Sequence, residues 1–94
     1  MKTEWDPAKK EATATARKLD FADFRRMFDG AHLIWRDVRK EYPETRMCVL
    51  GHIDERLHAG CYTWRGDTLR IISFRKANAR ENRKFKAQVQ ARTG

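Results

Sequence analysis

The chain has 94 residues, and its 21 Lys and Arg residues outnumber its 13 Asp and Glu residues, which gives a net charge of +8. This length supports one hydrophobic core, so a single domain over residues 1–94 is expected. Three Trp and five Phe residues argue against a disordered chain, and two Cys residues are too few for a disulfide framework. No stretch approaches the roughly 20 apolar residues of a membrane span, and the N-terminus lacks a signal-peptide run, so a cytoplasmic protein is predicted.

The N-terminal third predicts a short edge strand and two helices. Residues 3–5 suit the strand, and residues 6–18 suit a first helix, with Asp6 as N-cap and Pro7 at the first helical position. A second helix is predicted over residues 21–29. Three aromatic residues at helical spacing form its apolar, core-facing side: Phe21, Phe24 and Phe28.

From residue 31 onward the apolar pattern becomes that of β-strands separated by turns. The predicted strands cover residues 32–35, 46–50, 57–64 and 68–74. Turns are expected at residues 51–56 and 65–67, and successive hairpins make an antiparallel meander.

A last helix is predicted over residues 79–91. Asn78 and Glu81 have the spacing of a capping box at its start, and Phe85 and Val89 give it a thin apolar stripe. The predicted fold class is therefore α+β, with two N-terminal helices and a C-terminal helix packed on an antiparallel β-sheet meander.

Positive charge is concentrated near the C-terminus, where seven Lys and Arg residues accompany a single Glu among residues 75–94. Such a local excess is typical of surfaces that bind phosphate backbones. An acidic protein partner, an anionic membrane or simple solvation of a basic helix would explain the same charge. The predicted RNA-binding residues are Arg70, Lys76, Arg83 and Lys84, with Trp64 as a base-stacking residue.

Metal-free cleavage of RNA needs a group that takes the 2′-hydroxyl proton, cations for the developing charge and an acid for the leaving oxygen. The candidates for proton transfer are Glu81, His58, His52 and Glu55. The candidates for charge stabilisation are Arg46, Arg75 and Arg80. A structural role explains Glu81 equally well, because it completes the capping box.

Four residues of zinc-binding type lie close in the sequence: Cys48, His52, His58 and Cys61. Their spacing lacks the close ligand pairs of structural zinc sites. Two thiols packed into a sheet are the better interpretation, so no metal is predicted.

Motifs at both ends of the chain resemble those of a known family. The first is Glu4-Trp5-Asp6-Pro7-Ala8-Lys9, and the second is Arg70-Ile71-Ile72-Ser73-Phe74-Arg75-Lys76-Ala77 followed by Arg80-Glu81. Together they resemble the BrnT family of toxins from bacterial type II toxin–antitoxin systems. Arg46, Gly51 and Tyr62-Thr63 also match, so the resemblance covers nearly the whole chain.

The resemblance implies a RelE-like fold and a metal-independent endoribonuclease that needs no cofactor and inhibits translation. It implies a BrnA-like antitoxin as partner, RNA as substrate, contact with promoter DNA only through the antitoxin complex, and no membrane partner. Its matched polar residues place the active surface at Arg46, Arg75, Arg80 and Glu81. Phe85 stands where the family often has Tyr, which keeps open a non-catalytic nucleic-acid-binding module or a degenerate toxin that retains only antitoxin binding.

Overall fold

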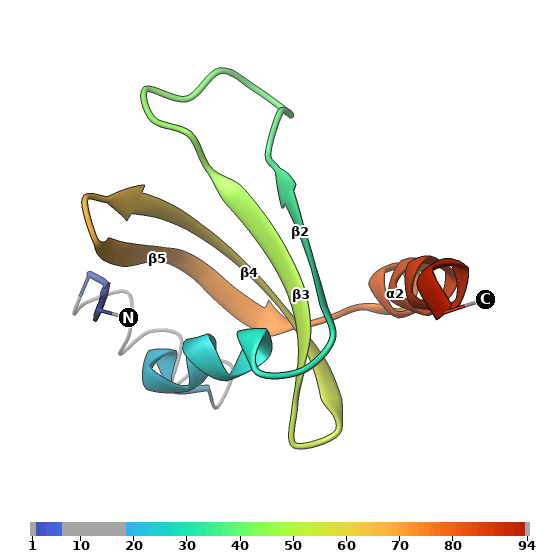
Figure 1. Cartoon of the computed structure of the whole chain (residues 1–94). Helices are drawn as coiled ribbons and strands as arrows, with labels where there is room; N and C mark the ends of the chain where they lie inside the picture. Colours follow the sequence, from blue (N-terminus) through green and yellow to red (C-terminus); the bar gives the residue numbers. More distant parts are fainter. Residues whose placement is uncertain (1, 7–18, 94) are drawn as a thin grey trace.

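The computed structural model describes residues 2–6 and 19–93, which form a five-stranded sheet with a helix on each side (Figure 1). In chain order the elements are β1 (Lys2–Glu4), η1 (Phe21–Phe28), β2 (His32–Arg36), β3 (Met47–Ile53), β4 (Arg56–Arg65), β5 (Thr68–Lys76) and α2 (Ala79–Thr93). From Pro7 on, the predicted first helix lies outside the described residues. The α+β class is confirmed, with one N-terminal helix among the described residues instead of two.

The sheet has the strand order β1-β5-β4-β3-β2, and strands β2 to β5 pair antiparallel with their chain neighbours. β1 differs, because it lies parallel to β5, with Lys2 opposite Thr68. The sheet is therefore mixed, and the predicted antiparallel meander is wrong for the sheet as a whole. β1 and β2 lie at opposite edges of the sheet, and β1 is not joined to its neighbour β5 by a hairpin that would force an antiparallel pairing.

The turn predicted at residues 51–56 is shorter than expected, because β3 continues to Ile53 and β4 begins at Arg56. Asp54 and Glu55 alone form it, with φ values of 49° and 67°. Two consecutive positive φ values are those of a type I′ turn, whose twist suits a two-residue hairpin. Here an Asp and a Glu adopt the left-handed conformation that this turn requires at both positions. Their residue types alone do not predict so tight a turn.

The helix η1 is a 3-10 helix that begins after Asp20, whose side chain accepts a hydrogen bond from the amide of Ala22. In a 3-10 helix residues three apart share one face. Accordingly Phe21, Phe24 and Met27 are buried. Phe28, predicted in the core from a 3.6-residue period, is only partly buried, and Met27 takes the third core position instead.

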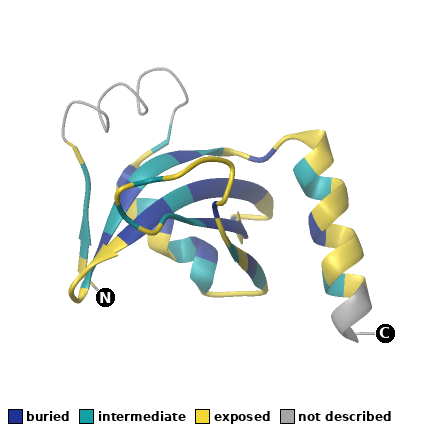
Figure 2. Cartoon of the chain, turned by 90° about the horizontal axis from the view of Figure 1, so that it is seen from above, coloured by how far each residue is buried: buried dark blue, intermediate teal, exposed yellow. Residues whose placement is uncertain are grey.

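The two faces of the sheet carry separate apolar clusters. The larger cluster lies between the sheet and η1 and includes Phe21, Phe24, Met27, Val49, Tyr62 and Phe74. The smaller cluster lies on the opposite face and comprises Leu33, Leu50, Leu57, Ala59, Ala77 and Phe85. Buried residues concentrate in the sheet, whereas most of α2 is exposed (Figure 2).

A bulge where β4 meets β5 determines which side chains face away from η1. Cys61 lies opposite Ser73 and Tyr62 lies opposite Ile71, which leaves Ile72 as the extra residue. The bulge shifts the alternation of β5, so the polar residues on either side of it project from the same face. By register, the residues of β5 on this open face are Arg70, Ser73 and Arg75.

The helix α2 contacts the sheet through the predicted apolar stripe. Phe85 is buried in the smaller cluster, and Val89 packs against that cluster. Among the described residues, no helix combines the length and apolar character needed to cross a membrane. The rest of α2 is free to present its charged side chains.

Candidate functional site

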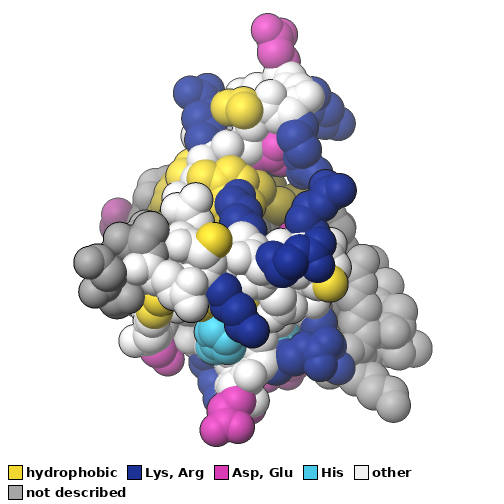
Figure 3. Space-filling view, turned by 90° about the vertical axis from the view of Figure 1, so that its right-hand side faces the viewer, with side chains coloured by type: hydrophobic (Ala, Val, Ile, Leu, Met, Phe, Trp, Pro, Cys, Tyr) yellow, Lys and Arg dark blue, Asp and Glu magenta, His cyan; other side chains and the backbone are white. Residues whose placement is uncertain are grey.

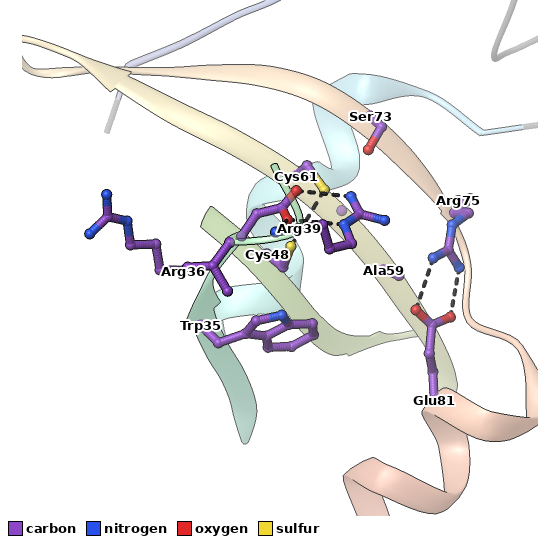
Figure 4. Close-up of a pocket in the computed structure, with 12 residues that line it drawn as sticks. Trp35, Arg36, Arg39, Cys48, Ala59, Cys61, Ser73, Arg75 and Glu81 are labelled. Atoms are coloured by element: carbon purple, nitrogen blue, oxygen red, sulfur yellow. Dashed lines mark hydrogen bonds and ion pairs between the residues drawn. The ribbon is translucent and has the colours of Figure 1, made fainter. Parts of the chain in front are cut away.

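The open face of the sheet bears a cleft of about 210 Å³ between the segment that follows β2 and the start of α2 (Figure 4). Strands β3, β4 and β5 form its floor through Cys48, Ala59, Cys61 and Ser73. Trp35 forms part of one wall. The charged residues that line it are Arg36, Asp37, Arg39, Arg75 and Glu81.

Arg75 and Glu81 form a bidentate ion pair at one side of this cleft. The Arg75 Nη1 and Nη2 atoms lie 2.6 Å and 2.8 Å from the two Glu81 carboxylate oxygens. The hydrogen bond from Arg75 lowers the pKa of Glu81, and the same bond raises the pKa of Arg75. Both groups are therefore charged at neutral pH, and the forked geometry holds the guanidinium in one orientation.

Glu81 also completes the predicted capping box of α2. Its carboxylate accepts a hydrogen bond from the Asn78 amide at 3.0 Å, and the Asn78 side chain accepts one from the Glu81 amide at 2.9 Å. The structural and the site interpretations of Glu81 are thus compatible, because one carboxylate binds both the helix start and Arg75. The start of α2 and the end of β5 are tied together at the cleft.

A second arginine, Arg39, lies at the opposite wall and was missed by sequence reasoning. The Asp37 carboxylate accepts hydrogen bonds from Arg39 Nε at 2.9 Å and Nη2 at 2.8 Å, and from the Tyr42 hydroxyl at 3.0 Å. The bonds from Arg39 hold the pKa of Asp37 well below its usual value. The Asp37 side chain is only 2% exposed, whereas that of Arg39 is 77% exposed. The sequence did not point to Arg39, because it does not show that one carboxylate of this charged loop is buried.

Two thiols lie side by side in the floor of the cleft. Cys48 and Cys61 face each other across β3 and β4, with their sulfurs 3.7 Å apart. Burial, followed by the neighbouring Cys61, raises the pKa of Cys48 to about 12, so this thiol stays protonated at neutral pH. The interpretation of the cysteines as thiols packed in a sheet agrees with this placement.

The four residues considered for zinc do not converge. His58 lies on the face covered by η1, where its ring contacts Phe74, whereas both thiols lie on the other face. Asp37, Cys48 and Cys61 do place their ligand atoms within 4.8 Å of one another. However, Arg39 and Tyr42 already provide four hydrogen bonds to the two Asp37 oxygens, so a metal would have to displace them.

Arg46, predicted as catalytic, does not line the cleft. Its guanidinium stacks on the Tyr42 ring, 4.2 Å from the ring centroid, and its carbonyl accepts a hydrogen bond from the Asp37 amide. Arg46 thus supports the loop that presents Asp37 and Arg39. Arg80, the fourth predicted catalytic residue, is exposed on the first turn of α2 and is also outside the cleft lining.

The predicted RNA-binding residues are spread over both faces. Arg70 lies on the open face, 3.5 Å from a Glu4 oxygen in an ion pair. Lys76 lies opposite His58 in register and so projects from the other face. Trp64 is 51% exposed but contacts Tyr62 on the face covered by η1, so it does not stack over the cleft.

The basic residues of α2 extend the positive charge beyond the cleft. The Lys84 ammonium lies 3.8 Å from the ring centroid of Trp35, a cation–π contact at the cleft wall. Arg83 is exposed on the same helix. Figure 3 views the molecule from the side on which α2 lies in Figure 1. It shows Lys and Arg side chains from the top of the view down across the surface below. The aromatic residue at the cleft is therefore Trp35, a position that sequence reasoning did not select.

The remaining candidates for proton transfer lie away from the cleft lining. His52 packs edge-on against Phe85, and Glu55 is in the β3–β4 turn. His58 is 5% exposed, and its Nδ1 lies 2.7 Å from the Arg56 carbonyl. Among these candidates the structure therefore brings only Glu81 to the cleft.

Burial lowers the pKa of His58 below its usual value of 6.5, with further lowering by the charges of Lys76 and Arg56. The unfolded chain then binds the proton more readily than the folded chain. The free energy of unfolding is therefore undiminished by His58 above about pH 6.5, and it falls as the pH drops toward the lowered pKa. We expect His58→Gln to remove this fall in the free energy of unfolding, which amounts to about 1.4 kcal/mol for each pH unit by which the His58 pKa is lowered. Urea unfolding at several pH values measures it. The exposed His52→Gln is the control, and an unchanged slope in His58→Gln would contradict the assignment.

A comparison with known families gives one match. A family model described as ribonuclease toxin, BrnT, of type II toxin–antitoxin system matches residues 5–81, which is more than half of the chain. The matched span includes Arg75 and ends at Glu81, and it leaves out Arg83 and Lys84. No curated protein matches the chain.

Proposed function

Because the chain belongs to the BrnT family of ribonuclease toxins of type II toxin–antitoxin systems, we propose that it is an endoribonuclease that cuts RNA in the cleft at Arg75 and Glu81. The observation that carries this proposal is the bidentate Arg75–Glu81 pair within a cleft whose charged lining has three arginines and two carboxylates. Such a site combines a guanidinium that keeps its Nε–H donor and its charge for phosphate oxygens with an ionised acceptor for a proton.

The proposed reaction is attack of a ribose 2′-oxygen on the adjacent phosphorus. The O2′–P bond forms and the P–O5′ bond breaks, which yields a 2′,3′-cyclic phosphate and a 5′-hydroxyl. The 2′-hydroxyl proton passes to the Glu81 carboxylate, and the leaving O5′ takes a proton from water. Arg75 stabilises the negative charge that develops on the phosphorane oxygens, so the reaction needs no metal.

The pKa of Glu81 determines how much Glu81 and Arg75 each contribute to the rate of cleavage. Because the Arg75 hydrogen bond lowers that pKa, Glu81 is ionised at neutral pH but is a weak base. General-base catalysis is most efficient when the pKa lies near the working pH. Most of the rate acceleration is therefore assigned to charge stabilisation by Arg75.

A toxin of a type II system has a cognate antitoxin, and we propose that a BrnA-like protein fills this role and carries the complex to promoter DNA. When free, the toxin would act in the cytoplasm, where cutting messenger RNA inhibits translation. The exposed cations of α2 would add salt-dependent affinity for the RNA backbone.

The proposal is tested by incubating the purified protein with RNA in the presence of EDTA and mapping the new ends. We expect 5′-hydroxyl and 2′,3′-cyclic phosphate ends from the wild type. Glu81→Gln is expected to cut at least tenfold more slowly, because general-base catalysis contributes about 10²–10⁴-fold and Glu81 is a weak base. Gln suits the third position of a capping box, so this variant should keep its circular dichroism spectrum.

The second candidate is a non-catalytic RNA-binding module. It is favoured by Phe85, which is buried in the smaller cluster and offers no hydroxyl group to a substrate. A binding module would protect RNA in a salt-dependent manner, and neither wild type nor Glu81→Gln would generate new ends. That outcome would overturn the ribonuclease proposal.

A further inference from the structure

Two of the three arginines that line the cleft lie on opposite walls, and each of these two is oriented by its own carboxylate. Arg75 is held by Glu81 through both Nη atoms, and Arg39 is held by Asp37 through Nε and Nη2. The two carboxylates have side-chain exposures of 18% and 2%. Glu81 at the start of α2 therefore orients Arg75 of β5, and Asp37 in the loop after β2 orients Arg39 of the same loop. Both arginines line one cavity (Figure 4).

Each guanidinium keeps donors for a further partner. A guanidinium has five N–H groups, and Asp37 occupies only Nε and one hydrogen of Nη2 in Arg39. The Nη1 group of Arg39 has no hydrogen bond within the described part of the chain. Arg75 likewise retains its Nε–H, because Glu81 and the Lys76 carbonyl bond only its Nη atoms. The remaining donors suit a ligand with several acceptor oxygens.

The two cations are also close enough to affect each other. Glu81 raises the pKa of Arg75, and the charge of Arg39 works against that rise. Three arginines and two carboxylates line the cavity, so its lining keeps an excess of positive charge that favours an anion there. The Ser73 hydroxyl lies in the floor beside Cys61 and adds a neutral donor.

We propose that Arg39 and Arg75, with Ser73 beneath them, form a clamp that binds one phosphodiester group of the substrate. The cavity of about 210 Å³ is smaller than the sites that enclose drug-sized ligands, which suits a phosphate with part of its nucleotide. Arg39 is then a substrate-binding residue. Tyr42 and Arg46 are positioning residues that act on it through Asp37 and the loop backbone. The choice of a phosphodiester rests on the proposed ribonuclease function.

The test uses inorganic phosphate as the probe at constant ionic strength, with binding measured by calorimetry on the full chain. Arg39→Ala and Arg75→Ala are each expected to weaken phosphate binding at least tenfold. Arg39→Lys is expected to restore less than half of the lost binding free energy, because an ammonium lacks the planar fork. Arg56→Ala, which removes an exposed cation at the β3–β4 turn, is the matched control and should bind phosphate within twofold of wild type.

Two further outcomes separate the clamp from the ribonuclease proposal. If the wild type cuts RNA but Arg39→Ala binds phosphate and cuts RNA as well as Arg56→Ala does, the clamp is wrong and the ribonuclease stands. If phosphate binding requires both arginines but no RNA is cut, the clamp is upheld and the ribonuclease proposal falls. Weak binding that falls equally in all three alanine variants would reflect general charge and would overturn the clamp.

Discussion

Arg75→Ala is expected to lower the kcat/KM of RNA cleavage by about 10²–10³-fold, the usual cost of removing one oriented donor from the charge-stabilising set of an active site. The physical reason is that the Arg75 fork is held in place by Glu81 before the substrate arrives. No reorganisation is then needed when the phosphorane charge develops. Single-turnover cleavage of a defined RNA measures the effect.

The fold should survive this change. The Arg75 side chain is 42% exposed, and partly exposed ion pairs contribute only about 0–1 kcal/mol to the free energy of unfolding. Glu81 keeps its capping bonds with Asn78. Arg80→Ala, which removes an exposed cation of α2 outside the cleft, should cost less than tenfold at low salt and nothing at high salt. Equal losses in both variants would place the chemistry elsewhere.

Local sequence patterns predicted the last helix better than they predicted the sheet. The Asn78–Glu81 capping box and the Phe85 stripe depend on contacts within a few residues, and both are present. The parallel pairing of β1 with β5 joins segments more than sixty residues apart in sequence, as Lys2 opposite Thr68 shows. No local pattern encodes that contact, because it depends on where the intervening chain delivers the later strand.

The candidate site shows the same contrast between what local sequence patterns predict and what strand pairing determines. Strict alternation along β5 would put Arg70 and Arg75 on opposite faces, since they are five residues apart. The bulge at Ile72 brings both to the open face, and it does so by register rather than by composition. Sequence motifs selected Arg75 and Glu81 together with Arg46 and Arg80. They could not show that Arg46 stacks on Tyr42 outside the cleft.

Arg39 escaped prediction for a related reason. It lies in a charged loop where each residue reads as solvated, and only the folded chain shows that Asp37 is buried beneath it. The Tyr42 hydroxyl and the Arg39 fork together satisfy that carboxylate. Burial of an ionised group requires such partners, so the geometry of the loop follows from its folded conformation and not from its residue types alone.

Gly51→Ala is expected to lower the free energy of unfolding by about 3 kcal/mol, at the upper end of the usual cost of overpacking a core. A Cβ at this position of β3 would lie 2.3 Å from the Met27 carbonyl oxygen and 2.8 Å from the Met27 Cβ. These atoms belong to the backbone and first side-chain carbon of η1, so no rotamer change relieves the clash. The helix must move away from the sheet and loosen the larger cluster. Urea unfolding measures the loss.

Gly30→Ala is the matched control, because a Cβ there meets nothing within 4 Å, so its stability should stay within about 1 kcal/mol of wild type. A Gly51→Ala protein as stable as Gly30→Ala would mean that η1 does not pack so closely on β3.

The position of the cleft leads to a further expectation about RNA cleavage by Gly51→Ala. Because η1 and the cleft lie on opposite faces of the sheet, folded Gly51→Ala molecules should keep the Arg75–Glu81 geometry. Their loss of RNA cleavage should therefore equal the loss of folded fraction, unlike Arg75→Ala, which loses cleavage while remaining folded.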